Sequence, residues 1–212
     1  MFIEGQAVVL NGDLFVSNNK NTVPTPIVQG QVGPAEEAED PKAILATMAA
    51  SAGDSLEHRA AREQVATQFY VEMNPTMRLD QIESQVRGIN LRHPVSVVAV
   101  PPDGAGENGD IVFQHCYPEG GMGQYFTDDQ SATADSLGIN DRVECRPTAT
   151  TPARVAPRVQ RVFRARKPVK ALRSTTGEID DTWSIPGEPK HTMGGGTQLF
   201  ITRPQHQNLT DA

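Results

Sequence analysis

Hydrophobic residues near the N-terminus fall in two short runs on either side of an Asn-Gly pair. Residues 8–10 precede Asn11-Gly12, and residues 14–16 follow it. Both turn residues tolerate positive φ, as a type I′ turn requires, so the pattern predicts a β-hairpin within residues 1–17. Residues 18–40 show no periodicity, contain several Pro and Gly residues and end in an acidic patch. We interpret them as an extended connector that lets the hairpin dock at a distance.

Apolar residues recur at helical spacing after this connector. Asp40 can cap a helix that starts with Pro41, and Asp54 can cap a second helix. A third helix is expected to begin at Pro75, with apolar residues at intervals of three and four, and Gly88 is a suitable stop. The pattern therefore predicts two or three helices.

The periodicity changes to that of strands from His93 onward. Residues 93–102 carry no Asp, Glu, Lys or Arg before the Gly-rich loop that follows, which is typical of a central or well-buried strand. Residues 111–117 are expected to pair with it as a hairpin, and further strands are expected at 142–146 and 197–204. The order of elements predicts an α+β fold with a small, mainly antiparallel sheet. We place its core in residues 41–150.

Charge changes this picture, because residues 154–173 contain eight basic residues and no acidic one. The whole chain has a net charge of −7, so a basic segment lies on an acidic body. We predict an extended basic arm or edge strand, followed by a C-terminal strand and tail, within residues 151–212. A short helix over residues 158–167 also fits the pattern. The basic residues form a candidate partner-binding surface: Arg154, Arg158, Arg161, Arg164, Arg166, Lys167, Lys170 and Arg173.

A complementary acidic window extends from His93 to Asp141 and contains no Lys or Arg. Its candidate contact residues are Asp103, Asp110, Asp128 and Asp129. The two regions can pair within one subunit as a solvated network, or between subunits as a head-to-tail contact. The basic segment can also bind nucleic acid, but an acidic body and few aromatic residues disfavour this.

Neither a membrane span nor a signal peptide is visible in the sequence. Cys116 and Cys145 are the only cysteines, too few for a disulfide scaffold. We therefore expect synthesis in a cytoplasm, no membrane partner and free thiols.

Candidate chemistry is weak. His115 and Cys116 do not have the spacing of paired zinc ligands, and no motif surrounds them as it would a nucleophile. The acidic loops do not follow a calcium-binding pattern. The glycine-rich segments 119–124 and 193–198 lack a phosphate-binding arrangement and resemble turns. We expect Trp183 to be a local anchor, and we predict no enzyme activity, metal or cofactor.

The long connector and the charge complementarity favour a structural or connector subunit of a large assembly. Such a protein would form homo-oligomers or dock on other subunits through extended arms, and a phage-like virion is the first context we consider. The alternative is a nucleic-acid-associated protein that binds through residues 154–173.

Overall fold

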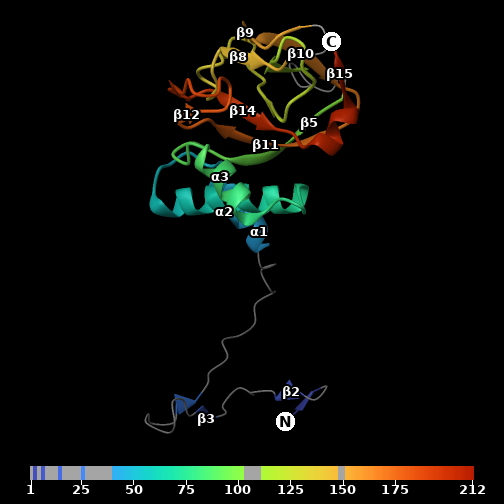
Figure 1. Ribbon diagram of the computed structural model, residues 1–212. Helices are drawn as coiled ribbons and strands as arrows, with labels where there is room; N and C mark the ends of the chain where they lie inside the picture. The colour runs from blue at the N-terminus through green and yellow to red at the C-terminus, as the bar shows by residue number, and fades with distance from the viewer. Residues whose placement is uncertain are drawn as a thin grey trace. The chain divides into compact units, whose positions relative to one another are not determined.

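The computed structural model describes residues 40–102, 111–147 and 151–212, together with four two-residue strands nearer the N-terminus (Figure 1). The chain separates into two compact units, Met1–Asp40 and Pro41–Ala212. The predicted division into four segments is not tested by this separation and stays a prediction. Among the described residues, no helix combines the length and the apolar character needed to cross a membrane.

The first unit contains two antiparallel strand pairs. Strand β1 (Phe2–Ile3) pairs with β2 (Gln6–Ala7), and β3 (Leu14–Phe15) pairs with β4 (Thr25–Pro26). The predicted hairpin is not confirmed, because β3 pairs with a later segment and the Asn-Gly turn lies outside the described residues. An Asn-Gly pair favours a tight turn, but it does not fix which residues pair beyond it.

Three α-helices begin the second unit: α1 (Pro41–Ala50), α2 (Leu56–Met73) and α3 (Leu79–Arg87). Ser55 caps α2, and its side chain accepts a hydrogen bond from the His58 amide. The expected cap Asp54 instead forms an ion pair with Arg59 at 2.6 Å. Gly88 ends α3, as predicted.

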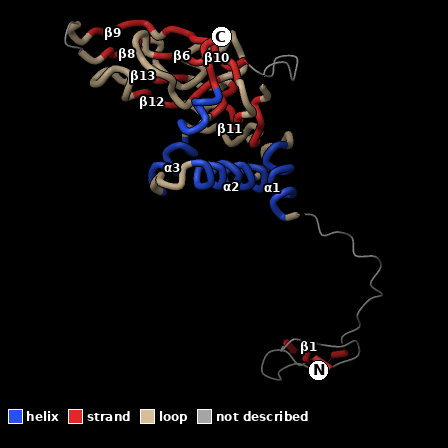
Figure 2. The backbone as a smooth tube through the Cα atoms, turned by 90° about the vertical axis from the view of Figure 1, so that its right-hand side faces the viewer, coloured by secondary structure: helices blue, strands red, loops and turns tan. Residues whose placement is uncertain are grey.

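Two antiparallel sheets follow the helices (Figure 2). The four-stranded sheet contains, in spatial order, β5 (Ser96–Val100), β11 (Val169–Thr175), β14 (Thr197–Phe200) and β7 (Tyr125–Phe126). The three-stranded sheet contains β15 (Leu209–Asp211), β10 (Val159–Ala165) and β6 (Ile111–Cys116). Two separate pairs are β8 (Arg142–Cys145) with β9 (Arg154–Pro157), and β12 (Ile179–Asp181) with β13 (Lys190–Thr192). The 3₁₀ helix η2 (Arg203–Asn208) precedes β15.

This architecture confirms the α+β class with antiparallel pairing, but it corrects the pairing of individual strands. The predicted hairpin between β5 and β6 is absent, because β5 pairs with β11 while β6 pairs with β10 in the other sheet. Strand β5 also lies at an edge of its sheet instead of at the centre. Its uncharged sequence reflects contact with α1 and α2, since helices cover one of its faces.

The basic segment does not form an extended arm in the structure. Most of its residues lie in β9, β10 and β11, while Arg158, Arg166 and Lys167 lie between these strands. β10 and β11 are inner strands of the two sheets. Phe163 and Leu172 are almost fully buried, whereas the charged side chains between the apolar positions extend to the surface. Lys and Arg can do this because their long aliphatic stems cover apolar surface while the charge stays in water.

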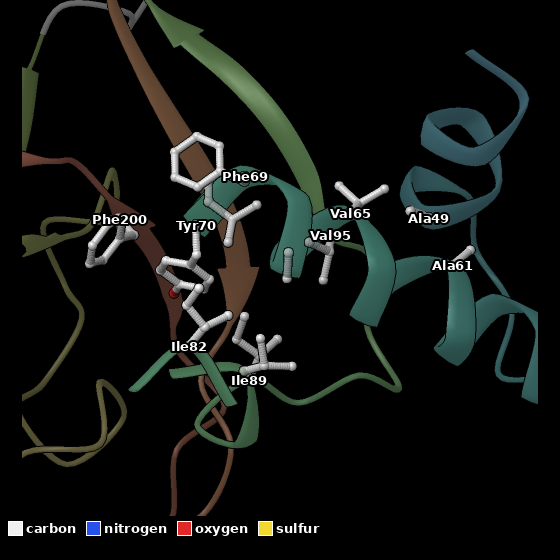
Figure 3. Packing of buried hydrophobic residues seen from close by; sticks show 12 residues of the cluster. Ala49, Ala61, Val65, Phe69, Tyr70, Ile82, Ile89, Val95 and Phe200 are labelled. Atoms are coloured by element: carbon white, nitrogen blue, oxygen red, sulfur yellow. The ribbon is translucent and has the colours of Figure 1, made fainter. Parts of the chain in front are cut away.

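The four-stranded sheet lies between two hydrophobic cores. Adjacent residues of a strand point to opposite faces, so Phe200 packs with the helices while Leu199 packs toward the three-stranded sheet. Figure 3 shows the helix-side core, in which Phe69 and Tyr70 of α2 contact Phe200. The ring centroids of Tyr70 and Phe200 are 4.9 Å apart in an edge-on arrangement. The unit therefore has three layers: helices, a four-stranded sheet and a three-stranded sheet.

A buried arginine ties the helices to the loops around them. The Arg62 side chain is 0% exposed, and its guanidinium donates to the carbonyl oxygens of Ala49, Ser51, Gly53 and Leu91 at 2.7–3.2 Å. Burial lowers the pKa of this group. The four acceptors replace the water that the charge loses on folding.

Candidate functional site

A cavity of about 830 Å³ opens in the second unit beside strand β7. This volume lies in the range of roughly 300–1,000 Å³ that is common for small-molecule sites. Its walls come from stretches that are distant in sequence: residues 84–85, 87–88, 114–117, 121–126, 137–139 and 178–179, together with Arg158, Trp183 and Gln198. We call it the main cavity.

Gln114 of β6 fixes one wall of the main cavity. Its Nε2 donates to the Tyr125 carbonyl at 2.8 Å, and its Oε1 accepts from the Gly123 amide at 2.9 Å. The side chain is 4% exposed, so these bonds are shielded from water. Gln114 therefore holds the glycine-rich segment 119–124, which the sequence indicated only as a turn, against β6 and β7.

The second glycine-rich segment, residues 193–198, is hydrogen-bonded to segments next to the residues that line the cavity. The Gly195 amide donates to the Thr176 carbonyl, and the Thr176 amide donates to the Gly196 carbonyl, at 2.8 and 2.9 Å. The Gly196 amide in turn donates to Ser136 at 2.8 Å, next to the lining residues 137–139. These backbone bonds connect the turn before Gln198 to the strand end before Glu178.

An aromatic chain links the cavity to the helix-side core. The Tyr125 ring lies 5.2 Å from that of Phe200, which also contacts Tyr70. Burial raises the pKa of the Tyr70 and Tyr125 hydroxyl groups. Both phenols are therefore neutral at neutral pH.

The buried carboxylate of Asp181 orders the residues that hold Arg158 at the cavity wall. Asp181 is 0% exposed and accepts hydrogen bonds from the amides of Asn140, Trp183 and Ser184 and from the Ser184 hydroxyl. Burial by itself raises the pKa of Asp181, but these hydrogen bonds outweigh it and hold the pKa below its ordinary value. The carboxylate is therefore charged at neutral pH.

Arg158 depends on this arrangement. Its Nη2 donates to the Ser184 hydroxyl at 2.8 Å, and its Nε donates to the Asn140 carbonyl at 2.9 Å. The guanidinium lies 5.0 Å from the centre of the Tyr117 ring. Asp181 thus orders both residues that hold Arg158, and the positive charge is fixed at the cavity wall.

The charges that line the main cavity are few. Glu178 is the only Asp or Glu among its described lining residues, and Arg87 and Arg158 are the only Lys or Arg. Trp183 lines the cavity with about half of its surface exposed. One carboxylate, two cations and exposed aromatic rings suit a ligand with a flat ring, a cationic centre and an anionic group.

Of the predicted partner-binding residues that the structure describes, only Arg158 lines the main cavity. Arg154 pairs with Glu119 and Arg173 with Asp128, both at 2.7 Å. Arg161 pairs with Asp211, and Lys170 with Glu72. These exposed pairs lie within one chain and each contributes little, about 0–1 kcal/mol.

The remaining predicted residues lie apart from the cavity. Arg164 is part of β10, Arg166 and Lys167 are exposed beyond it, and Asp129 bonds with Ser131 in its own loop. Asp103 and Asp110 lie outside the described residues. A partner-binding role for the twelve residues stays a prediction.

His115 and Cys116, which the sequence analysis considered as zinc ligands or a nucleophile, are hydrogen-bonded to other residues of the chain. The His115 Nε2 lies 2.9 Å from the Ala132 carbonyl, and the Cys116 thiol donates to Gln114. Burial raises the pKa of Cys116, so its reactive thiolate is disfavoured. Among the described residues, no cluster of three His, Cys, Asp or Glu side chains could hold a metal ion.

Sequence reasoning missed Gln114, Glu178 and Gln198 as cavity residues and gave Trp183 only an anchoring role. None of them stands in a recognisable motif. The available signal was the pair of glycine-rich segments, which flank the cavity in the structure.

Comparison with known proteins identifies relatives that are toxins. Over 118 residues, 56% of this chain, the sequence is 31% identical to the NAD(P)(+) glycohydrolase toxin Tse6 of Pseudomonas aeruginosa. The match covers 25% of that toxin's length. The fold is similar to the solved structure of Tse6 in complex with Tsi6, with a TM-score of 0.56 and 25% identity, covering 73% of this chain and 96% of that chain.

These relatives overturn two predictions. The prediction of a virion structural subunit, with nucleic-acid binding as its alternative, is wrong, because the relatives are toxins. The prediction of no enzyme activity is wrong as well, because it conflicts with the similarity to a glycohydrolase. The family described as Ntox46, bacterial toxin 46, matches residues 47–206. The chain therefore belongs to the Ntox46 family of bacterial toxins.

Proposed function

We propose that this chain hydrolyses NAD⁺ or NADP⁺ at the bond between nicotinamide and ribose. Two observations support this activity: the similarity to an NAD(P)(+) glycohydrolase toxin, and the main cavity with its one lining carboxylate. The carboxylate of Glu178 is the observation that carries the proposal, because the chemistry requires a negative charge beside a developing cation.

The reaction breaks a C–N bond and forms a C–O bond. The electron pair of the glycosidic bond moves to the pyridinium nitrogen, so nicotinamide leaves as a neutral molecule and needs no general acid. The ribose carbon becomes oxocarbenium-like, as in other glycoside hydrolysis. The oxygen of a water molecule then bonds to that carbon and a proton is released, which gives ADP-ribose or its 2′-phosphate.

Four residues that line the cavity have a role in this chemistry. The Glu178 carboxylate stabilises the oxocarbenium-like ribose and accepts a hydrogen bond from the attacking water. Trp183 and Tyr117 offer faces on which the cationic nicotinamide ring can stack. Arg158, held by Ser184 and Asn140, binds the pyrophosphate.

A protein partner is part of the proposal. The similar Tse6 structure is a complex with Tsi6. A cell that makes an NAD(P)⁺-degrading toxin needs a protein that blocks it, so we expect an inhibitor that covers the mouth of the main cavity. This replaces the virion subunits predicted from the charge pattern.

The test is to incubate the purified chain with NAD⁺ and to follow nicotinamide and ADP-ribose by chromatography. Glu178→Gln should lower kcat by about 10²–10³-fold, since removing one preorganised electrostatic group typically costs this much. Glu188→Gln is the matched control, because Glu188 is an exposed acid outside the cavity.

A wild-type chain that releases no nicotinamide from either dinucleotide would contradict the proposed function. Full activity in the Glu178→Gln variant would remove the assigned role of the carboxylate. Nicotinamide release without free ADP-ribose would show that the ADP-ribosyl group is transferred to an acceptor other than water. The reaction would then be a transfer and not a hydrolysis.

A further inference from the structure

A second cavity of about 480 Å³ adjoins the main cavity. Tyr117 and Trp183 line both cavities, so the two spaces meet at these exposed aromatic residues. The other walls of the second cavity include Glu119, Glu144 and Arg146. Three of its ten described lining residues are charged, against three of 22 in the main cavity.

Arg158 stands at the junction of the two cavities. It lines the main cavity, while its guanidinium contacts Ser184 and Tyr117, which both line the second cavity. Its Nη1 has no hydrogen-bond acceptor within the described residues. A fixed guanidinium with a free donor between two cavities suits a pyrophosphate that joins two nucleoside halves.

Glu144 belongs to β8, and Arg146 directly follows the last residue of this strand, Cys145. Both residues line the second cavity. Glu119 is paired with Arg154, but the Glu144 carboxylate has no hydrogen bond or ion pair within the described residues. A free carboxylate in such a cavity can accept a hydrogen bond from a ribose 2′-hydroxyl, and a neighbouring arginine can bind a 2′-phosphate.

We propose that the second cavity binds the adenosine half of the dinucleotide, and that Glu144 and Arg146 read its 2′ position. This inference rests on the proposed function for the identity of the whole substrate. Glu144 favours NAD⁺ by accepting from the free 2′-hydroxyl, and it repels a 2′-phosphate. Arg146 has the opposite effect, because it attracts the 2′-phosphate of NADP⁺.

The experiment compares KM for NAD⁺ and NADP⁺ in two variants of the full chain. Glu144→Gln should raise KM for NAD⁺ and lower it for NADP⁺, whereas Arg146→Gln should raise KM for NADP⁺. Each change should be about tenfold or more, as expected for a hydrogen bond to a charged group. Glu188→Gln and Arg142→Gln are matched controls, because both residues are exposed and line neither cavity.

Nicotinamide mononucleotide, which lacks the adenosine half, separates the two cavities. Its hydrolysis should be the same in the wild type and in both variants. Equal effects on this substrate and on NAD⁺, or unchanged KM values for both dinucleotides, would overturn the proposal while leaving the glycohydrolase activity in place.

A binding measurement separates this inference from the proposed function. Calorimetry with 5′-AMP and adenosine 2′,5′-bisphosphate requires no turnover, and Arg146→Gln should weaken the bisphosphate by about tenfold. The chain could bind these probes with the expected dependence on Glu144 and Arg146 and yet hydrolyse neither dinucleotide. That result would support the adenosine site and contradict the proposed hydrolysis. Absence of binding to both probes would overturn the adenosine site.

Discussion

At the residue scale, Asp181 determines the geometry around Arg158 although it does not line either cavity. Its two oxygens accept four hydrogen bonds, from the Asn140, Trp183 and Ser184 amides and the Ser184 hydroxyl. Asn140 and Ser184 then hold the Arg158 guanidinium. Asp181 is therefore a positioning residue for the junction of the two cavities.

Asp181→Asn should reduce the free energy of unfolding at pH 7 by about 2–4 kcal/mol, because an amide cannot accept all four bonds and leaves buried donors unpaired. It should also raise KM for NAD⁺ more than it lowers kcat, since Arg158 loses its support. Urea unfolding and steady-state kinetics measure the two effects. Asp180→Asn is the control, because its bond to His191 is exposed.

The pH dependence of stability gives a second readout for Asp181. The folded-state pKa lies below the ordinary value of 3.8, so this group stabilises the fold above about pH 4 and the contribution is lost as pH falls through the folded pKa. The wild type should therefore approach the Asp181→Asn variant in stability at acid pH. A difference that stays constant from pH 7 to pH 3 would contradict this assignment.

At the scale of elements, the turn between β13 and β14 supports the cavity through close backbone contact. Gly194 has φ of +65°, and a methyl group at this position would overlap the Gly177 carbonyl next to Glu178. Gly195 has φ of +86°, but a methyl group there would meet no atom within 4 Å. Substitution of Gly195 therefore tests only the cost of the left-handed backbone conformation, whereas substitution of Gly194 also tests the close contact with the Gly177 carbonyl.

Gly195→Ala should cost about 1–2 kcal/mol, which is the cost of a left-handed conformation for an L-residue. Gly194→Ala should cost at least about 3 kcal/mol, because the overlap with Gly177 adds to the same conformational cost. It should also reduce activity by displacing Glu178. Thermal unfolding with nicotinamide release checks both effects, and equal losses in the two variants would show that the close approach is unimportant.

At the scale of the whole second unit, stability depends on keeping the helices against the four-stranded sheet. Phe200 contacts Phe69 and Tyr70 on the helix side, and the neighbouring Leu199 packs on the opposite face of the sheet. Arg62 connects α2 to residues 49–53 and Leu91 through one buried and three partly buried hydrogen bonds. The helical layer is thus attached by both apolar packing and a buried charge.

Arg62→Met should lower the free energy of unfolding by at least about 3 kcal/mol, because several buried carbonyl groups lose their donor. Arg59→Met on the same helix is the matched control. Its exposed ion pair with Asp54 should contribute no more than about 1 kcal/mol. Chemical denaturation measures both variants, and similar losses would mean that the buried hydrogen bonds add nothing beyond an exposed pair.

The sequence by itself determined the elements whose bonds are local. Helix hydrogen bonds connect residues four apart, so the apolar spacing and the signals at Pro41 and Gly88 were sufficient to place α1 and the end of α3. The start of α3 was predicted wrongly, because the helix begins at Leu79 and not at Pro75. Short runs of strand-forming residues between turn-rich stretches likewise placed β5, β6, β8 and β14, and with them the α+β class. These predictions required no knowledge of what each element contacts.

Only the tertiary structure decided how the strands pair and where the site lies. Strand partners are distant in sequence, and a strand pattern does not name its partner, so β6 joined β10 and the basic segment became inner strands. The charge asymmetry suggested a docking arm, because the sequence does not show that buried residues such as Phe163, Ala165, Ala171 and Leu172 alternate with the charged side chains in β10 and β11. Gln114, Arg158, Glu178 and Trp183 carry no shared motif. They become one site because the layers bring their separate segments to a common cavity.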